Sequence, residues 1–177
     1  MVGGLLLNPE LASLLRCPVC AGALLAGQRS LVCAQGRTFD VAREGYVNLL
    51  PSGRRARDLG DSRPMLTARR SFFDRGHYDP LAARIADKAL PFLPAGGSVV
   101  DLGCGEGYYL GWLHRAGDFC CIGVDASKDA ARLASRRYPR AGFVVADLWR
   151  DTCIASAAAD LALNIFAPRH ATEFARL

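Results

Sequence analysis

A glycine-rich segment that follows an apolar run carries the strongest chemical signal in the sequence. Residues 99–107 read Val-Val-Asp-Leu-Gly-Cys-Gly-Glu-Gly, so that Gly103, Gly105 and Gly107 alternate with other residues. Glycine between a strand and a helix permits a tight turn and a close approach of the backbone to a ligand. A dinucleotide fingerprint would read Gly-x-Gly-x-x-Gly and hold a pyrophosphate on the helix N-terminus. The spacing here points to a different cofactor.

Four acidic residues lie where they could hold such a cofactor. Asp101 and Glu106 stand beside the glycines, where they would suit S-adenosylmethionine, which has no phosphate and carries amino and sulfonium charges. Asp125 ends the next predicted strand, about 20 residues after the loop, where an acid can accept hydrogen bonds from both ribose hydroxyls. Asp147 ends the third strand, where its carboxylate could meet the adenine amine. Each acid could instead be a helix N-cap or a solvated loop residue, above all Asp125 with Ser127 behind it, but the set together favours the cofactor site.

Alternating strands and helices must position these residues. Strands are predicted at 99–102, 121–124, 143–145 and 161–165, and helices at 65–74, from Asp79-Pro80 to 92, at 108–115 and at 127–138. Asp79 is the predicted N-cap of the second helix, with Pro80 at its first helical position. Apolar strands separated by helices imply a parallel sheet covered on both faces, so the fold class is α/β. The region up to about Leu50 has short strands between tight turns. Such a module buries little by itself and normally needs a staple.

The cysteines near the N-terminus offer that staple. The chain has seven cysteines, an odd number in a sequence that otherwise looks intracellular, so a disulfide framework is not expected. Cys17-x-x-Cys20 followed by Cys33 predicts a metal site instead. Four more cysteines are expected to be buried or half-buried in the larger domain, namely Cys104, Cys120, Cys121 and Cys153.

Composition sets broad limits on the function. The 177 residues are 51% apolar and 22% charged, which suits a packed and water-soluble protein. No apolar stretch is long enough to span a bilayer, and residues 1–15 lack a basic flank and a cleavage signal, so a cytoplasmic protein is expected. The net charge of +5 is compatible with a polyanionic partner, although the arginine excess could equally reflect a high-GC genome.

Further motifs follow in an order that points to a family. They are residues 38–50 (Thr-Phe-Asp-Val-Ala-Arg-Glu-Gly-Tyr-Val-Asn-Leu-Leu), 76–78 (Gly-His-Tyr), 101–109 and 164–169 (Asn-Ile-Phe-Ala-Pro-Arg), together with the three cysteines. With these motifs the chain resembles the bacterial 23S ribosomal RNA guanine-N1 methyltransferases of the RlmA group, which includes tylosin-type macrolide resistance methyltransferases. Residues 164–169 look more like the branch from Gram-positive bacteria and antibiotic producers, which modifies the neighbouring guanine in the same hairpin.

The resemblance implies a Rossmann-like class I methyltransferase that transfers a methyl group from S-adenosylmethionine to N1 of a guanine in a 23S rRNA hairpin loop. It implies cofactor contacts from Tyr78, Gly105 and Glu106. Asn164 and Arg169 lie where methyltransferases often orient the target, although Arg169 could be a solvated loop cation. A looped-out base is expected, because N1 is engaged in paired guanine, and the family is thought to act as dimers. Arginines that could meet RNA phosphates, or equally form a solvated surface, are Arg54, Arg55, Arg57, Arg69 and Arg70.

The sequence departs from the family pattern at the zinc site. The family's fourth ligand is a histidine, and its position falls on Arg37 in this chain. Arginine stays protonated and cannot bind a metal. We expect zinc to be held by Cys17, Cys20 and Cys33 with water or a borrowed ligand, at reduced affinity.

The expected organisation has three parts: a zinc-ribbon-like module at 1–50, a linker with helices at 51–97, and the first four strands of the methyltransferase domain at 98–177. Family members continue past the position of Leu177, so a C-terminally truncated chain with its fourth strand at an open edge is expected. The alternative function is then an inactive fragment that binds RNA without the cofactor. A small-molecule methyltransferase would share the cofactor loop but not the N-terminal module, and the glycine spacing disfavours an NAD-dependent enzyme.

Overall fold

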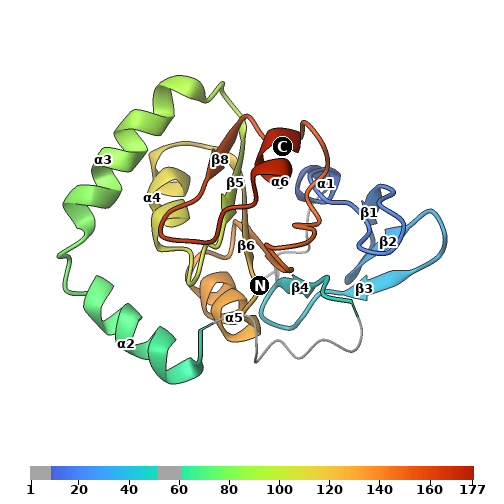
Figure 1. Cartoon of the computed structure of the whole chain (residues 1–177), viewed down its shortest axis with the longest axis horizontal. Helices are drawn as coiled ribbons and strands as arrows, with labels where there is room; N and C mark the ends of the chain where they lie inside the picture. The colour runs from blue at the N-terminus through green and yellow to red at the C-terminus, as the bar shows by residue number, and fades with distance from the viewer. Residues whose placement is uncertain (1–8, 52–60) are drawn as a thin grey trace.

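The structure, a computed structural model, describes residues 9–51 and 61–177. It has a small antiparallel sheet formed by the N-terminal residues and a larger parallel sheet formed by the rest. In Figure 1 the helices α2 and α3 lie on one side of the molecule and the small sheet lies on the other. No helix in the described ranges is long and apolar enough to cross a membrane.

The small sheet has three strands in the order β1-β2-β3. The N-terminal elements are α1 (Pro9–Ser13), β1 (Leu24–Ala26), β2 (Ser30–Cys33) and β3 (Thr38–Asp40). A tight turn joins β2 to β3, with Gly36 at φ +76°, a backbone conformation that suits glycine. This turn brings Arg37 back beside Cys33, since the N–H of Cys33 donates to the carbonyl of Arg37 over 3.0 Å.

The large sheet has five parallel strands in the order β4-β7-β6-β5-β8. The strands are β4 (Tyr46–Asn48), β5 (Ser98–Leu102), β6 (Cys120–Asp125), β7 (Gly142–Val145) and β8 (Leu161–Leu163). Four of them correspond to the predicted strands, and β8 is shorter than the predicted 161–165. Within the described residues, β8 forms one edge of the sheet, as expected.

Helices α3, α4 and α5 cover one face of this sheet, and α2 lies beside α5. The helices are α2 (Arg63–Phe73), α3 (Asp79–Ala89) with the short 3-10 turn η2 (Leu90–Phe92), α4 (Tyr108–Ala116), α5 (Lys128–Arg137) and α6 (Ala171–Arg176). Because strand side chains alternate between faces, Val99, Cys121 and Phe143 point toward these helices. The parallel α/β fold class is as predicted.

The opposite face of the sheet is covered by the N-terminal module. Val100, Ile122 and Val144 share one core with Leu11 and Leu15. Residues of the small sheet, including Leu24, Leu31, Cys17 and Cys33, join the same core, and Phe174 of α6 packs against it. The module is therefore packed onto the sheet and is not a separate body on a linker.

Two local features differ from the sequence expectation. The strand β4 was not predicted, and it lies in the range assigned to the N-terminal module while pairing with β7 of the large sheet. The domain boundary at residue 50 stays a prediction. The prediction that Asp79 caps α3 is wrong: the capping residue is Tyr78, and Asp79 is already helical. The Asp79 carboxylate instead contacts another helix, since it accepts the Tyr108 hydroxyl over 2.5 Å.

Candidate cofactor site and cysteine cluster

The glycine loop between β5 and α4 has backbone angles that favour glycine at three positions. Gly103, Gly105 and Gly107 have φ of +84°, +55° and +77°, a region that other residues rarely adopt. A side chain on Gly103 would also collide with Ala167, whose Cβ is 2.2 Å from the place of the missing Cβ. The loop is tied to the next strand, because the N–H groups of Gly103 and Cys104 both donate to the carbonyl of Val124.

Asp125 at the end of β6 holds this loop in place. Its Oδ2 accepts the N–H of Gly105 over 2.8 Å, and its Oδ1 accepts the N–H of Ser127 over 2.8 Å. Burial raises the pKa of Asp125, and these two hydrogen bonds oppose the shift. The N-cap of α5 is Ser127 and not Asp125, because the Ser127 side chain accepts the N–H of Ala130. A carboxylate offers about four acceptor sites, so Asp125 retains capacity for ribose hydroxyls.

Asp101 and Tyr109, which stand just before and just after the glycine loop in the chain, each have a buried polar atom without a partner in the part of the chain that the structure describes. Within the described residues, Oδ2 of Asp101 and the hydroxyl of Tyr109 have no hydrogen-bond partner. Burial, and then the neighbouring Asp125, raise the pKa of Asp101 to about 7. Burial is also the largest cause that raises the pKa of Tyr109 to about 12, with Tyr78 and Asp101 adding to it. Buried polar atoms without partners are rare in folded proteins, and here a polar ligand would supply the partners.

Glu106 lies inside the protein between two arginines. Its side chain is 1% exposed, with Oε1 3.4 Å from Arg137 and Oε2 3.9 Å from Arg70. Burial raises the pKa of Glu106, while Arg137 and Arg70 oppose that shift. Arg70 therefore faces an internal carboxylate and is only partly available to RNA.

Asp147 follows the adjacent strand β7 at the same edge of the sheet. Its side chain accepts the N–H of Trp149 over 3.0 Å, and its backbone forms a bridge with Asp151. Because β5, β6 and β7 are parallel neighbours, Asp101, Asp125 and Asp147 all lie at the carboxyl edge of the sheet, where ligands of such sheets bind. The structure thus brings the predicted acids together around one loop.

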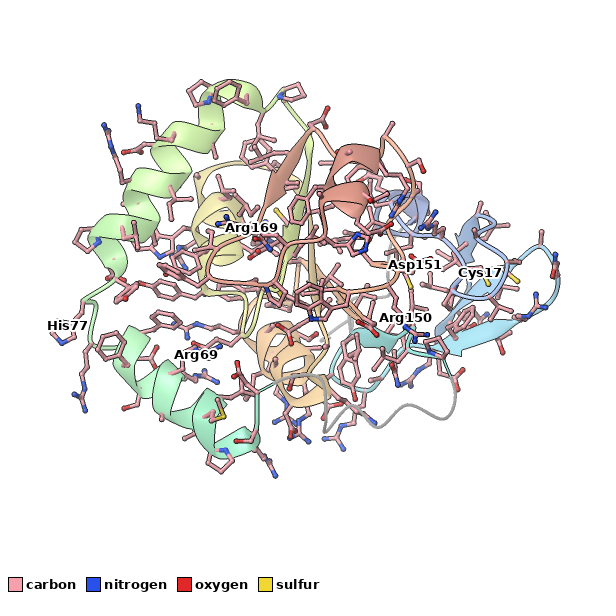
Figure 2. All side chains as sticks on the ribbon, in the orientation of Figure 1. Cys17, Arg69, His77, Arg150, Asp151 and Arg169 are labelled. Atoms are coloured by element: carbon pink, nitrogen blue, oxygen red, sulfur yellow. The ribbon has the colours of Figure 1, made fainter. Side chains whose placement is uncertain are left out.

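The loop after β8 closes this edge from the other side. The Asn164 amide donates to the carbonyl of Leu102 at the end of β5 over 2.9 Å, and Arg169 donates to the Asn164 side-chain oxygen over 3.3 Å. Figure 2 shows Arg169 on this loop. Asn164 thus fixes the loop to the end of β5. Arg169 contacts the Asn164 side chain and remains exposed. Their predicted contact with a target base stays a prediction.

Aromatic side chains line the region between this loop and α3. The ring of Tyr78 lies 5.7 Å from Phe73 and 6.5 Å from Phe166, and Phe166 lies 6.4 Å from Tyr109. Phe166 is 80% exposed and has φ +55°, which is unusual for a bulky residue. Sequence reasoning missed Phe166 and Tyr109. The signal available was their place in two of the motifs that carry the resemblance, residues 101–109 for Tyr109 and 164–169 for Phe166.

The three predicted metal ligands come together in the N-terminal module. The sulfur atoms of Cys17, Cys20 and Cys33 all lie within 4.8 Å of one another. Within the described ranges, these three residues are the cluster of potential ligands that could hold a metal ion. Arg37 stands in the place of a fourth ligand, with Nη1 4.0 Å from Sγ of Cys33. Burial opposes ionisation of Cys33, but hydrogen bonds from the Arg37 and Gln35 backbone and from the Arg37 guanidinium lower its pKa to about 7. Three converging sulfurs, one already inclined to the thiolate, fit a zinc ion.

Two family models match the chain, one over the N-terminal module and one over most of the large sheet. Residues 15–56 match the RlmA N-terminal zinc ribbon, and residues 99–176 match a methyltransferase domain. The chain is therefore similar to the RlmA zinc ribbon in its N-terminal part and to a methyltransferase domain in its C-terminal part. Its large sheet has the Rossmann-like fold of class I S-adenosylmethionine-dependent methyltransferases, as predicted.

Curated relatives match almost the whole of this chain. A 23S rRNA (guanine(748)-N(1))-methyltransferase from Streptomyces fradiae is 45% identical over 92% of this chain and 59% of its own length. A relative from Micromonospora griseorubida is 38% identical over 97% of this chain and 64% of its own length. An amino pentose methyltransferase from Micromonospora echinaspora, solved with S-adenosylmethionine, aligns over 56% of this chain and 42% of its own at 21% identity and a TM-score of 0.47. The chain spans less than two thirds of the curated relatives it matches.

Changing Arg37 to histidine is expected to raise the zinc affinity about tenfold or more, because an imidazole would complete a tetrahedral set that three cysteines leave open. Competition with a chromogenic chelator measures this affinity. Arg29→His is the matched control, since Arg29 is exposed in the turn before β2. Equal affinities of Arg37→His and the unmodified chain would contradict the assignment of residue 37 to the open fourth position of the zinc site.

Proposed function

We propose that this chain forms the cofactor-binding and RNA-recognising part of a 23S rRNA guanine-N1 methyltransferase that uses S-adenosylmethionine. The observation that supports it most is the packing of an RlmA zinc ribbon onto the same sheet whose carboxyl edge gathers Asp101, the glycine loop and Asp125. The curated relative from Streptomyces fradiae carries out this reaction according to its name. Action on a hairpin loop, dimer formation, a cytoplasmic location and macrolide resistance are finer predictions of the same proposal.

S-adenosylmethionine, when bound, would supply an electrophilic methyl group for in-line transfer to guanine N1. The leaving group would be S-adenosylhomocysteine, and the N1 proton would pass to a base. Because the leaving group is already activated, most of the catalysis must come from positioning. Asp125 would hold the ribose and the loop together, since its carboxylate already fixes the N–H of Gly105. Asp101 and the Tyr109 hydroxyl would orient polar groups of the cofactor with their unpartnered atoms. Asn164 and Arg169 would shape the side from which the base enters.

Only two of the five arginines predicted to contact RNA phosphates lie within the described residues. Arg54, Arg55 and Arg57 lie outside the described residues. Arg69 pairs with Asp61 over 2.6 Å, and Arg70 faces Glu106. Contact of these arginines with RNA therefore stays a prediction, and the two described ones have acidic partners within the protein.

We expect the purified chain to transfer a labelled methyl group to one guanine of a 23S rRNA hairpin. Methylation at N1 blocks the pairing edge, so reverse transcription should stop at that guanine. Hairpins in which each loop guanine is replaced in turn by adenosine serve as controls, and one of them should lose the signal. RNA binding without binding of S-adenosylmethionine would contradict the proposal and select the alternative, an RNA-binding fragment without activity.

A further inference from the structure

Arg69 of α2 reaches over the glycine loop. Its Nη1 lies 3.5 Å from the point where a Cβ on Gly105 would stand, so the guanidinium lies against the loop backbone. Figure 2 shows Arg69 between α2 and the central part of the molecule. The positive charge of Arg69 also opposes the rise in the pKa of Asp125 and of Tyr109, in keeping with its place against the loop. A cation thus lies beside the glycine loop of the predicted cofactor site.

Four acidic side chains lie around the loop. Asp101, Asp125 and Asp147 lie at the carboxyl edge of the sheet, and Glu106 lies just behind the loop. S-adenosylmethionine carries two positive groups, the sulfonium and the ammonium, and one negative group, the carboxylate of its amino-acid part. The acids can match the positive groups and the hydroxyls, but the carboxylate requires a cationic donor.

Arg69 is the described cation best placed for that carboxylate. Arg70 and Arg137 face Glu106 and Asp74, and Arg169 leans on Asn164. Among the described residues Arg69 has one ion-pair partner, the carboxylate of Asp61, and both side chains are partly exposed. The guanidinium fork matches a carboxylate in two parallel hydrogen bonds, which an ammonium group cannot do.

We propose that Arg69 binds the methionyl carboxylate of S-adenosylmethionine, which takes the place now held by the carboxylate of Asp61. Asp61 is held near the loop because its backbone carbonyl accepts the Ser127 hydroxyl over 3.0 Å. Exchange of one carboxylate for another keeps the guanidinium paired, so little electrostatic energy is lost when the ligand enters. This inference rests on the proposed function, since it assigns a residue to the cofactor that the function requires.

Decarboxylated S-adenosylmethionine, which lacks the carboxylate alone, separates this role from every other effect of Arg69. Calorimetric titration of the whole chain should show that S-adenosylmethionine binds about tenfold or more tightly than the decarboxylated compound. In Arg69→Ala this preference should vanish through loss of affinity for S-adenosylmethionine alone. In Arg69→Lys, which keeps the charge without the fork, it should shrink. In Asp61→Asn, which removes the competing carboxylate, it should grow.

Arg136→Ala is the matched control, because Arg136 lies on α5, is more exposed and pairs with Glu44 away from the loop. It should retain the full preference, and circular dichroism checks the folding of every variant. A preference that is unchanged in folded Arg69→Ala or Arg69→Lys overturns the inference and leaves Arg69 a structural or RNA-facing cation. If the unmodified, folded chain binds neither compound, the proposed function itself fails, and this inference fails with it.

Discussion

Replacing Asp125 with alanine is expected to weaken the binding of S-adenosylmethionine about a hundredfold. The carboxylate has two tasks that alanine cannot perform. It fixes the glycine loop by accepting the N–H of Gly105, and it holds the start of α5 by accepting the N–H of Ser127. In the proposed complex its remaining lone pairs would accept the ribose hydroxyls, and hydrogen bonds to a charged group are worth about 1.5–3 kcal/mol each.

Calorimetric titration near neutral pH measures this loss, and thermal unfolding shows whether the variant stays folded. Asp129→Ala is the control, because Asp129 lies in the first turn of the same helix but pairs with Arg132 and takes no part in the loop. Its affinity should stay within a factor of about two, as expected for a surface change. A folded Asp125→Ala protein that binds the cofactor normally would refute the assignment of this loop as the cofactor site.

The glycine loop was predictable because its signal is local. Three alternating glycines after an apolar strand are informative since each stands at a positive φ that other residues avoid. The same holds for the buried cysteines: Cys104, Cys121 and Cys153 are buried as expected of free cysteines in a core, and Cys120 is half-buried. In both cases the residue type by itself indicates the local structure, a positive φ for glycine and a buried position for free cysteine.

The position of the N-terminal module was not predictable in the same way. Short strands and a cysteine pair indicate a zinc ribbon, but they do not say what it packs against. In the structure, Leu11 and Leu24 share a core with Ile122, which is about a hundred residues away along the chain. The strand Tyr46–Asn48 has only three residues, which is too short for its sequence pattern to predict pairing with the distant strand β7. Contacts of this kind depend on the whole fold and leave little trace in any one segment.

Arg69 illustrates the same limit at the level of the site. In the sequence it stands next to Arg70 on a predicted helix, and the two look like one basic patch. In the structure Arg69 reaches the glycine loop and Arg70 faces the buried Glu106. Neighbouring residues on a helix project about 100° apart, so only the position of the helix beside the sheet shows which task each side chain has.

Glu173 joins three parts of the chain, and its replacement by glutamine is expected to destabilise the fold by about 3 kcal/mol at neutral pH. Its side chain, 8% exposed, accepts the N–H and hydroxyl of Thr152 and pairs with Arg176 over 2.7 Å. Arg16 of the N-terminal module lies 3.7 Å away on the other side. Burial by itself would raise the pKa of Glu173, but the hydrogen bonds from Arg176 and Thr152 lower it to about 2. Glutamine would leave the two arginines without their shared counter-charge.

The lowered pKa fixes the pH range in which this stabilisation acts. A carboxylate whose pKa falls on folding stabilises the protein above its unfolded pKa, near 4.5, and loses that effect as the pH drops toward 2. The difference in unfolding free energy between the unmodified chain and Glu173→Gln, measured in urea, should therefore be constant above about pH 5 and shrink below it. Glu10→Gln, at an exposed position in α1, should show no such convergence. If Glu173→Gln follows the unmodified chain at every pH, the ionised carboxylate does not hold the N-terminal module, residue 152 and α6 together, and their packing must rest on the apolar core alone.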